Sequence, residues 1–198
     1  MNQNGSYKPF NSILIYTILL FPITAIAHTG MIEPISFIAG MEHPISGIDH
    51  ILAMIAVGFL AVQMGGSALW AMPTAFVSVM IIGGILGALQ IYVPFIETGI
   101  IASVLILGII IATSARFSVL ASVLIVGFFA IFHGVAHGME MPINSYAMAY
   151  GAGFALATAT LHGIGIAMGM SLNKLQMINL QRWAGGMITL GGIYLIIA

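Results

Sequence analysis

Two short clusters of histidine and carboxylate side chains are the part of this sequence best suited to chemistry. Their members are His43, Asp49 and His50 in the first cluster, and His133, His137 and Glu140 in the second. Imidazole and carboxylate groups together are the ligands that borderline divalent transition metals prefer. Each cluster adjoins a long apolar segment, where ionisable groups are expensive to bury and are usually functional. We therefore expect these residues to bind a divalent metal ion.

The first cluster allows two interpretations of Asp49. Ser46 followed three residues later by Asp49 fits a capping box, which is a structural role at the start of a helix. On one continuous helix His43 and His50 would lie about 10 Å apart, too far to share an ion. We favour a bend at Pro44 and Gly47 that folds His43 back toward Asp49 and His50.

The second cluster has a simpler geometry. His133 and His137 have the i, i+4 spacing that places two imidazoles on one helical face, where they can hold one metal ion. Glu140 continues the same stripe about one turn later. Gly134 and Gly138 follow the histidines and allow another helix or the ion to approach closely.

The composition indicates an integral membrane protein, because a soluble domain cannot bury this much apolar surface. Hydrophobic residues make up 61% of the 198 residues and charged residues 5%, with a mean hydropathy of +1.15. The net charge of −1 and the lack of a basic run argue against a nucleic-acid partner. The absence of cysteine excludes disulfides, thiolate metal sites and iron–sulfur clusters.

The first 27 residues have the pattern of a secretory signal peptide. Lys8 precedes an apolar stretch over residues 13–21, and residues 25–27 form a small-x-small cleavage site ending at Ala27. An uncleaved anchor helix is the alternative. The expected organisation is a signal peptide over residues 1–27 and one transmembrane domain over residues 28–198.

The expected fold is an all-α membrane protein with six spans, each near the roughly 20 residues that cross a bilayer. Glycine-rich faces are expected to pack the helices closely, and whether several copies assemble into a homo-oligomer is left open. The predicted spans are residues 47–64, 69–90, 95–113, 117–137, 145–172 and 178–197, of which the fifth is long.

The charges predict how the chain is oriented in the membrane. Arg116, Lys174 and Arg182 lie in or near connections on one side, which the positive-inside rule assigns to the cytoplasm. Both termini of the mature chain then face outward, in agreement with a cleaved signal peptide. The acidic side chains at the opposite ends are Glu42, Glu97 and Glu140.

Three residues outside the two clusters are further candidate metal ligands. Cleavage after Ala27 would make His28 the N-terminus, where its amino group and imidazole can chelate a metal. Glu97 lies near the outer end of the third predicted span. His162 lies in the middle of the fifth, where metal binding and an interhelical hydrogen bond are equal alternatives.

The two clusters carry a resemblance to a known family. The chain contains H-x5-D-H-x-L-A-M-x2-V-G from His43 and F-H-G-x-A-H-G-x-E from Phe132. Together these motifs resemble the HupE/UreJ family of nickel permeases. The resemblance implies a prokaryotic inner-membrane permease that is not an enzyme. It would take up Ni²⁺, or Co²⁺ in some members, as its substrate for hydrogenase or urease maturation, without a permanently bound cofactor. The resemblance also implies that the residues of both clusters have functional roles.

Two other classes of protein remain as alternatives. A membrane-embedded zinc hydrolase would hold zinc with His133, His137 and another imidazole, with Asp49 or Glu140 as the base. A haem-bearing electron carrier would use histidines of two helices as axial ligands, but it gives the carboxylates no role.

Overall fold

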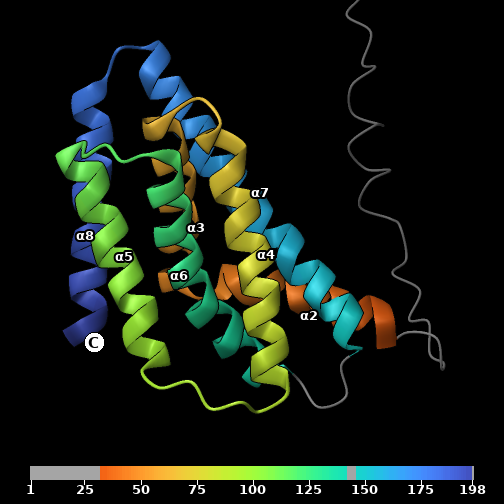
Figure 1. Ribbon diagram of the computed structural model, residues 1–198. Coiled ribbons are helices and arrows are strands. Elements are labelled where there is room, and N and C mark those ends of the chain that lie inside the picture. Colours follow the sequence, from red (N-terminus) through yellow and green to blue (C-terminus); the bar gives the residue numbers. More distant parts are fainter. Residues whose placement is uncertain (1–31, 142–145, 198) are drawn as a thin grey trace, which may run out of the picture. The chain divides into compact units, whose positions relative to one another are not determined.

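The computed structural model describes residues 32–141 and 146–197, which form α-helices joined by short connections (Figure 1). The predicted signal peptide and His28 lie outside the described residues. The described part contains no β-strand. Its helices are α2 (Ile32–Ser46), α3 (Ile48–Met64), α4 (Ala68–Ala88), α5 (Ile96–Thr113), α6 (Val119–Met139), α7 (Ala147–Lys174) and α8 (Ile178–Ile197).

Each of the six predicted spans coincides with one of the helices α3 to α8, and α7 is the long one, with 28 residues. Within the described residues, the four helices α4 to α7 are long and apolar enough to cross a membrane by themselves. A fifth span results if α2 and α3 together count as one bent span. The chain is therefore a multi-pass, all-helical protein, and the total of six spans stays a prediction.

A sharp break separates α2 from α3. The two helices meet at an angle of 83°, and in Figure 1 α2 runs across the direction of the other helices. The predicted bend is confirmed at Gly47, but Pro44 lies inside α2. The sequence did not indicate a helix before the bend. The capping box is wrong: the N-cap of α3 is Gly47 and has no side-chain cap. Ser46 ends α2 and donates its hydroxyl to the carbonyl of His43 instead, at 2.7 Å.

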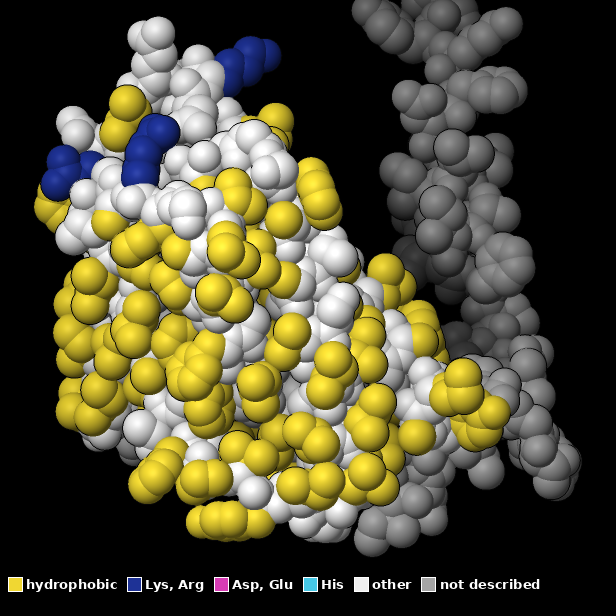
Figure 2. Space-filling view, in the orientation of Figure 1, with side chains coloured by type: hydrophobic (Ala, Val, Ile, Leu, Met, Phe, Trp, Pro, Cys, Tyr) yellow, Lys and Arg dark blue, Asp and Glu magenta, His cyan; other side chains and the backbone are white. Residues whose placement is uncertain are grey.

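The helix α3 is the centre of the bundle, because it contacts every other described helix. Most of its length from Ala53 to Val62 is buried. The surrounding helices expose large apolar side chains outward, among them Ile82 on α4 and Leu124 on α6. Hydrophobic side chains cover most of the face drawn in Figure 2, as expected for a surface in contact with lipid.

Glycines mark the closest contacts between helices. A Cβ atom added at Gly83 of α4 would lie 2.6 Å from the backbone oxygen of Ile131 and 3.1 Å from the Cα of Gly134, both on α6. Gly58 of α3 and Gly165 of α7 adjoin each other in the same way. Small residues at such points let helix backbones approach within van der Waals contact, which stabilises packing inside a membrane.

The basic side chains and three of the carboxylates lie at opposite ends of the helices. Figure 2 shows the Lys and Arg side chains at one end, where Figure 1 places the α5–α6 and α7–α8 connections. Asp49 and Glu97 lie in the first turns of α3 and α5, and Glu140 caps the end of α6. These three carboxylates lie at the other end, where both candidate clusters are found.

Close packing at glycine predicts the effect of a single methyl group. We expect Gly83→Ala to lower stability by about 1–3 kcal/mol, because the new methyl group overlaps the backbone of α6. The measurement is the apparent midpoint of thermal unfolding in detergent. Gly186→Ala on α8 is the matched control, since nothing lies within 4 Å of its added Cβ. Equal midpoints for the two variants would contradict the packing argument.

Candidate metal-binding site

One group of side chains in the described residues has metal-binding geometry, and it joins the two clusters. The outer group consists of His43, His137 and Glu140, each with one ligand atom within 4.8 Å of the others. The Nε2 atom of His43 lies 3.0 Å from Oε2 of Glu140. The Nδ1 atom of His137 lies 3.6 Å from the same oxygen. Two imidazoles and a carboxylate thus converge from two helices.

Secondary structure positions each member of the outer group. His43 lies in the last turn of α2, and the α2–α3 break places that turn beside the end of α6. His137 lies in the last turn of α6, and Glu140 is the residue after the helix, with its N–H bonded to the carbonyl of Ala136. The imidazole of His137 is buried, whereas the side chain of Glu140 is 58% exposed. The outer group therefore has an accessible side and a buried side.

A second layer of imidazoles adjoins the outer group. The ring of His50 lies 4.3 Å from that of His137 and 5.2 Å from that of His133, between centroids. Nδ1 of His50 lies 2.6 Å from a carboxylate oxygen of Asp49, and Nδ1 of His133 lies 3.0 Å from the carbonyl of Phe129. Both partners accept hydrogen bonds, so each Nδ1 carries a proton, and in the neutral imidazole each Nε2 presents a lone pair. Carboxylate and carbonyl groups orient metal-binding histidines in this way.

Four other ring nitrogens of these histidines are buried and have no hydrogen-bond partner among the described residues. They are Nε2 of His50, Nε2 of His133 and both ring nitrogens of His137. A buried polar atom without a partner costs about 1–3 kcal/mol, and such atoms are rare in folded proteins. Several of them side by side favour a site for a ligand that accepts lone pairs, such as a metal ion.

Glu140 supplies charge to the outer group. Its contacts with His137 and His43 lower its pKa from 4.5 to about 2, although partial burial acts in the opposite direction. The carboxylate is therefore ionised throughout the physiological pH range. Neutral imidazoles alone would leave both charges of a divalent ion uncompensated in a medium of low dielectric constant.

A cavity of about 430 Å³ opens beside the second layer. Asp49, His50, Glu97 and Glu140 line it, together with apolar residues of α5 and α6. Glu97 of α5 therefore lies at the same end of the helix bundle as the two clusters. Three carboxylates around one cavity attract cations and raise their local concentration.

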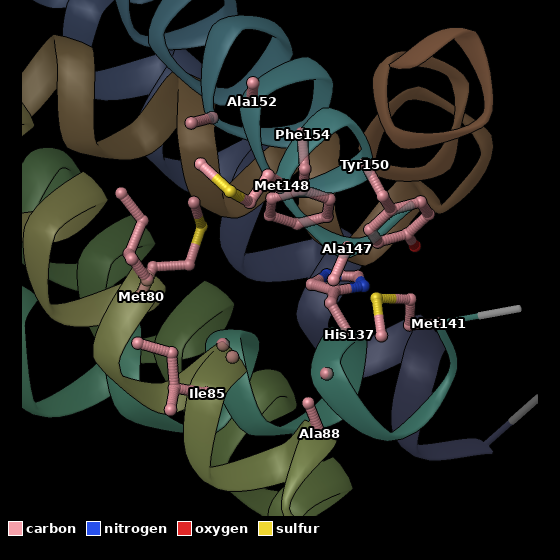
Figure 3. A pocket seen from close by; sticks show the side chains of 16 residues that line it. Met80, Ile85, Ala88, His137, Met141, Ala147, Met148, Tyr150, Ala152 and Phe154 are labelled. Atoms are coloured by element: carbon pink, nitrogen blue, oxygen red, sulfur yellow. The ribbon is translucent and has the colours of Figure 1, made fainter. Parts of the chain in front are cut away.

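The apolar side of the site consists of aromatic residues of α7. The ring of Phe154 lies 4.2 Å from that of His137, and Tyr150 lies 6.1 Å from His43. Figure 3 shows both beside His137, at the edge of an apolar pocket of about 420 Å³ between α4, α6 and α7. Sequence reasoning missed these two residues. Their i, i+4 spacing was the available signal, but it is shared with ordinary packing residues.

The structure groups the predicted residues differently from the sequence analysis. His43 was expected to fold toward Asp49 and His50, and it contacts His137 and Glu140 instead. His133 and His137 were expected to share one ion, and the ring of His50 contacts both of them. The reason is the 83° break, which separates the histidines of α2 and α3.

Comparisons with known proteins identify the family of this chain. The family model of the HupE/UreJ protein matches residues 16–195. The chain belongs to the HupE/UreJ family. Over 180 residues it is 42% identical to Protein HupE of Rhizobium leguminosarum bv. viciae. The aligned region covers 90% of this chain and 93% of that protein. No solved structure matches the chain.

Family membership fixes the broad class of activity. HupE/UreJ proteins are hydrogenase and urease accessory permeases for nickel and cobalt, and they are not enzymes. The chain is accordingly a multi-pass membrane protein that contacts lipid and has a metal substrate.

The outer group predicts how one carboxylate contributes to metal binding. We expect Glu140→Gln to weaken the binding of Ni²⁺ to the purified protein by at least about tenfold, since even residues that only orient metal ligands contribute that much. Isothermal titration in detergent measures the affinity. Glu42→Gln is the matched control: it removes the same charge from α2 beside His43, but Glu42 is exposed and outside the outer group. Similar losses in both variants would indicate a general effect of charge and contradict a specific site.

Proposed function

We propose that this protein takes up Ni²⁺ across the prokaryotic inner membrane and supplies it to the maturation of a metalloenzyme such as hydrogenase or urease, with Co²⁺ as a second substrate. The observation that carries the proposal is the outer group, in which His43, His137 and Glu140 converge within 4.8 Å. Nitrogen and oxygen ligands suit nickel and cobalt, and the chain has no thiolate to favour a softer ion. The family assignment supports the same class of substrate.

Uptake begins at the acidic end of the helices. Asp49, Glu97 and Glu140 attract a hydrated divalent cation into the cavity that they line. The ion exchanges part of its water for His43, His137 and Glu140. His50, held in one tautomer by Asp49, then offers Nε2 next to His137, and His133 offers the next lone pair toward the middle of α6.

Electrostatics drives the ion inward. A membrane potential that is negative inside contributes about 4.6 kcal/mol per 100 mV for a divalent ion, twice the value for one charge. The binding sites must remain moderate in affinity, because an ion that is bound too tightly does not move on. A series of neighbouring imidazoles meets this requirement, since each step exchanges one ligand for a similar one.

The zinc hydrolase considered as an alternative is not favoured. HupE/UreJ proteins are permease-type accessory proteins, and the described ligand set is explained by transport of the ion itself. The same assignment argues against a haem protein, in which Asp49 and Glu140 have no role.

Uptake should depend on His137, because its imidazole adjoins both His43 and His50. We expect His137→Ala to reduce uptake of radioactive Ni²⁺ into proteoliposomes by at least about tenfold, while expression and membrane insertion stay intact. Asp49→Asn should also cause a large loss, because the amide can still accept from His50 but lacks the charge. In the parental protein, excess Co²⁺ or Zn²⁺ should compete with Ni²⁺.

One result would contradict the site, and another would contradict the substrate. Parental rates of uptake in both variants, with the protein properly inserted, would remove the site from the transport path. Uptake of Cu⁺ by the parental protein, without any response to Ni²⁺, would assign the substrate to the methionines instead.

The charge distribution predicts the orientation in the membrane. Arg116, Lys174 and Arg182 should face the cytoplasm, and the acidic end and the mature termini should face outward. A single cysteine introduced near Glu97 should react with an impermeant thiol reagent added to intact cells, and one near Lys174 should not. The natural chain has no cysteine that would add background. The reverse labelling pattern would overturn the orientation.

A further inference from the structure

His162 is a buried histidine that the outer group does not include. It lies in the middle of α7 with 1% of its surface exposed, and neither ring nitrogen has a hydrogen-bond partner among the described residues. An interhelical hydrogen bond was the alternative role of His162, and the described residues provide no such bond. An ionisable side chain buried at this depth in a span is usually functional.

His162 lies much deeper in the helix bundle than the outer group. A Cβ at Gly58 of α3 would meet the backbone oxygen of His162. Gly58 comes just over two helical turns after His50, about 12 Å along the axis of α3. His162 therefore lies near the middle of the bundle, too far from the outer group to share its ion.

Two further polar atoms lie on the helix faces around His162. Thr158 is one turn earlier on α7, is fully buried, and donates its hydroxyl to the sulfur of Met80 on α4 at 3.7 Å. Phe76, one turn from Met80, packs its ring against His162 at 5.1 Å and against His133 at 5.4 Å, between centroids. An imidazole, a hydroxyl and a thioether thus line the α4–α7 interface, separated from His133 by one aromatic ring.

We propose that His162, Thr158 and Met80 form an inner site that binds the transported transition-metal ion after it leaves the outer group. This inference rests on the proposed function. Imidazole is the principal ligand, the thioether is a soft second ligand, and the hydroxyl oxygen is a third. The inner site contains no carboxylate, so it leaves the charge of the ion uncompensated and binds it weakly. Weak binding suits a site from which the ion must move on.

A packing role for His162 makes a different prediction about transport. If the side chain only fills space, leucine fills nearly the same space and removes two unpaired nitrogens, so stability should stay equal or rise. Transport would then be unchanged. If His162 binds the ion, the same substitution removes transport while stability is preserved.

The test compares His162→Leu with the parental protein in three measurements. We expect uptake of radioactive Ni²⁺ into proteoliposomes to fall at least about tenfold. The affinity of the outer group for Ni²⁺, measured by titration in detergent, should stay parental, and the midpoint of thermal unfolding should not decrease. This combination separates His162 from His137, whose loss is expected to weaken outer binding as well.

A matched pair of threonines on α7 tests the inner site independently. Thr158→Val removes the buried hydroxyl with little change of shape and should reduce uptake. Thr160→Val is the control, because Thr160 is exposed and its hydroxyl bonds only to the carbonyl of Leu156 in its own helix. This control should transport at the parental rate.

The outcomes distinguish the two proposals. If the parental protein takes up no metal, the proposed function fails, and the inner site fails with it. If the parental protein and His162→Leu transport equally well while His137→Ala does not, the inner site alone is wrong. If His162→Leu loses uptake together with outer binding and thermal stability, His162 has a structural role and the inner site is again wrong.

Discussion

The break between α2 and α3 is the constraint on which the site depends. On a straight helix through Gly47, His43 and His50 would lie on the same helical face, about 10 Å apart. The 83° turn instead lets the end of α2 reach the end of α6 while α3 continues into the bundle. His43 and His50 therefore both meet His137. Glycine contacts such as Gly40 against Tyr150 hold α2 in place on α7.

Much of the fold could be predicted because its signals are local. Apolar segments of the right length located helices α3 to α8, since a lipid environment demands continuous apolar surface. The two clusters stood out because ionisable residues are so costly in such segments. The i, i+4 spacing of His133 and His137 placed both on one face of α6, and both are buried in the structure. Each of these inferences depends on neighbours in the chain rather than on contacts between distant residues.

The arrangement of the clusters could not be predicted for the same reason. Whether Asp49 caps α3 or orients His50 depends on where α2 ends. In the sequence alone, Ser46 fits both the end of α2 and the N-cap of α3. The choice is made by packing: α2 continues to Ser46, so Gly47 becomes the N-cap and Asp49 is free to accept from His50. Likewise, Glu97 joined the acidic cavity only because α5 starts beside the end of α6, which its own neighbours in the sequence do not reveal.

The distribution of carboxylates gives the bundle a direction. Beyond the first turns of α3 and α5 and the cap of α6, no Asp or Glu occurs along helices α3 to α8. An ion that leaves Glu140 and the cavity would therefore meet only neutral ligands. The affinity of the protein for the ion would then decrease as the ion moves inward. Under the proposed orientation the membrane potential acts in the opposite sense, because it favours a cation more with each step toward the cytoplasm. In the proposed pathway, stronger binding at the acidic end and weaker binding deeper in the bundle are thus offset by the field, so that the ion is not trapped at either place.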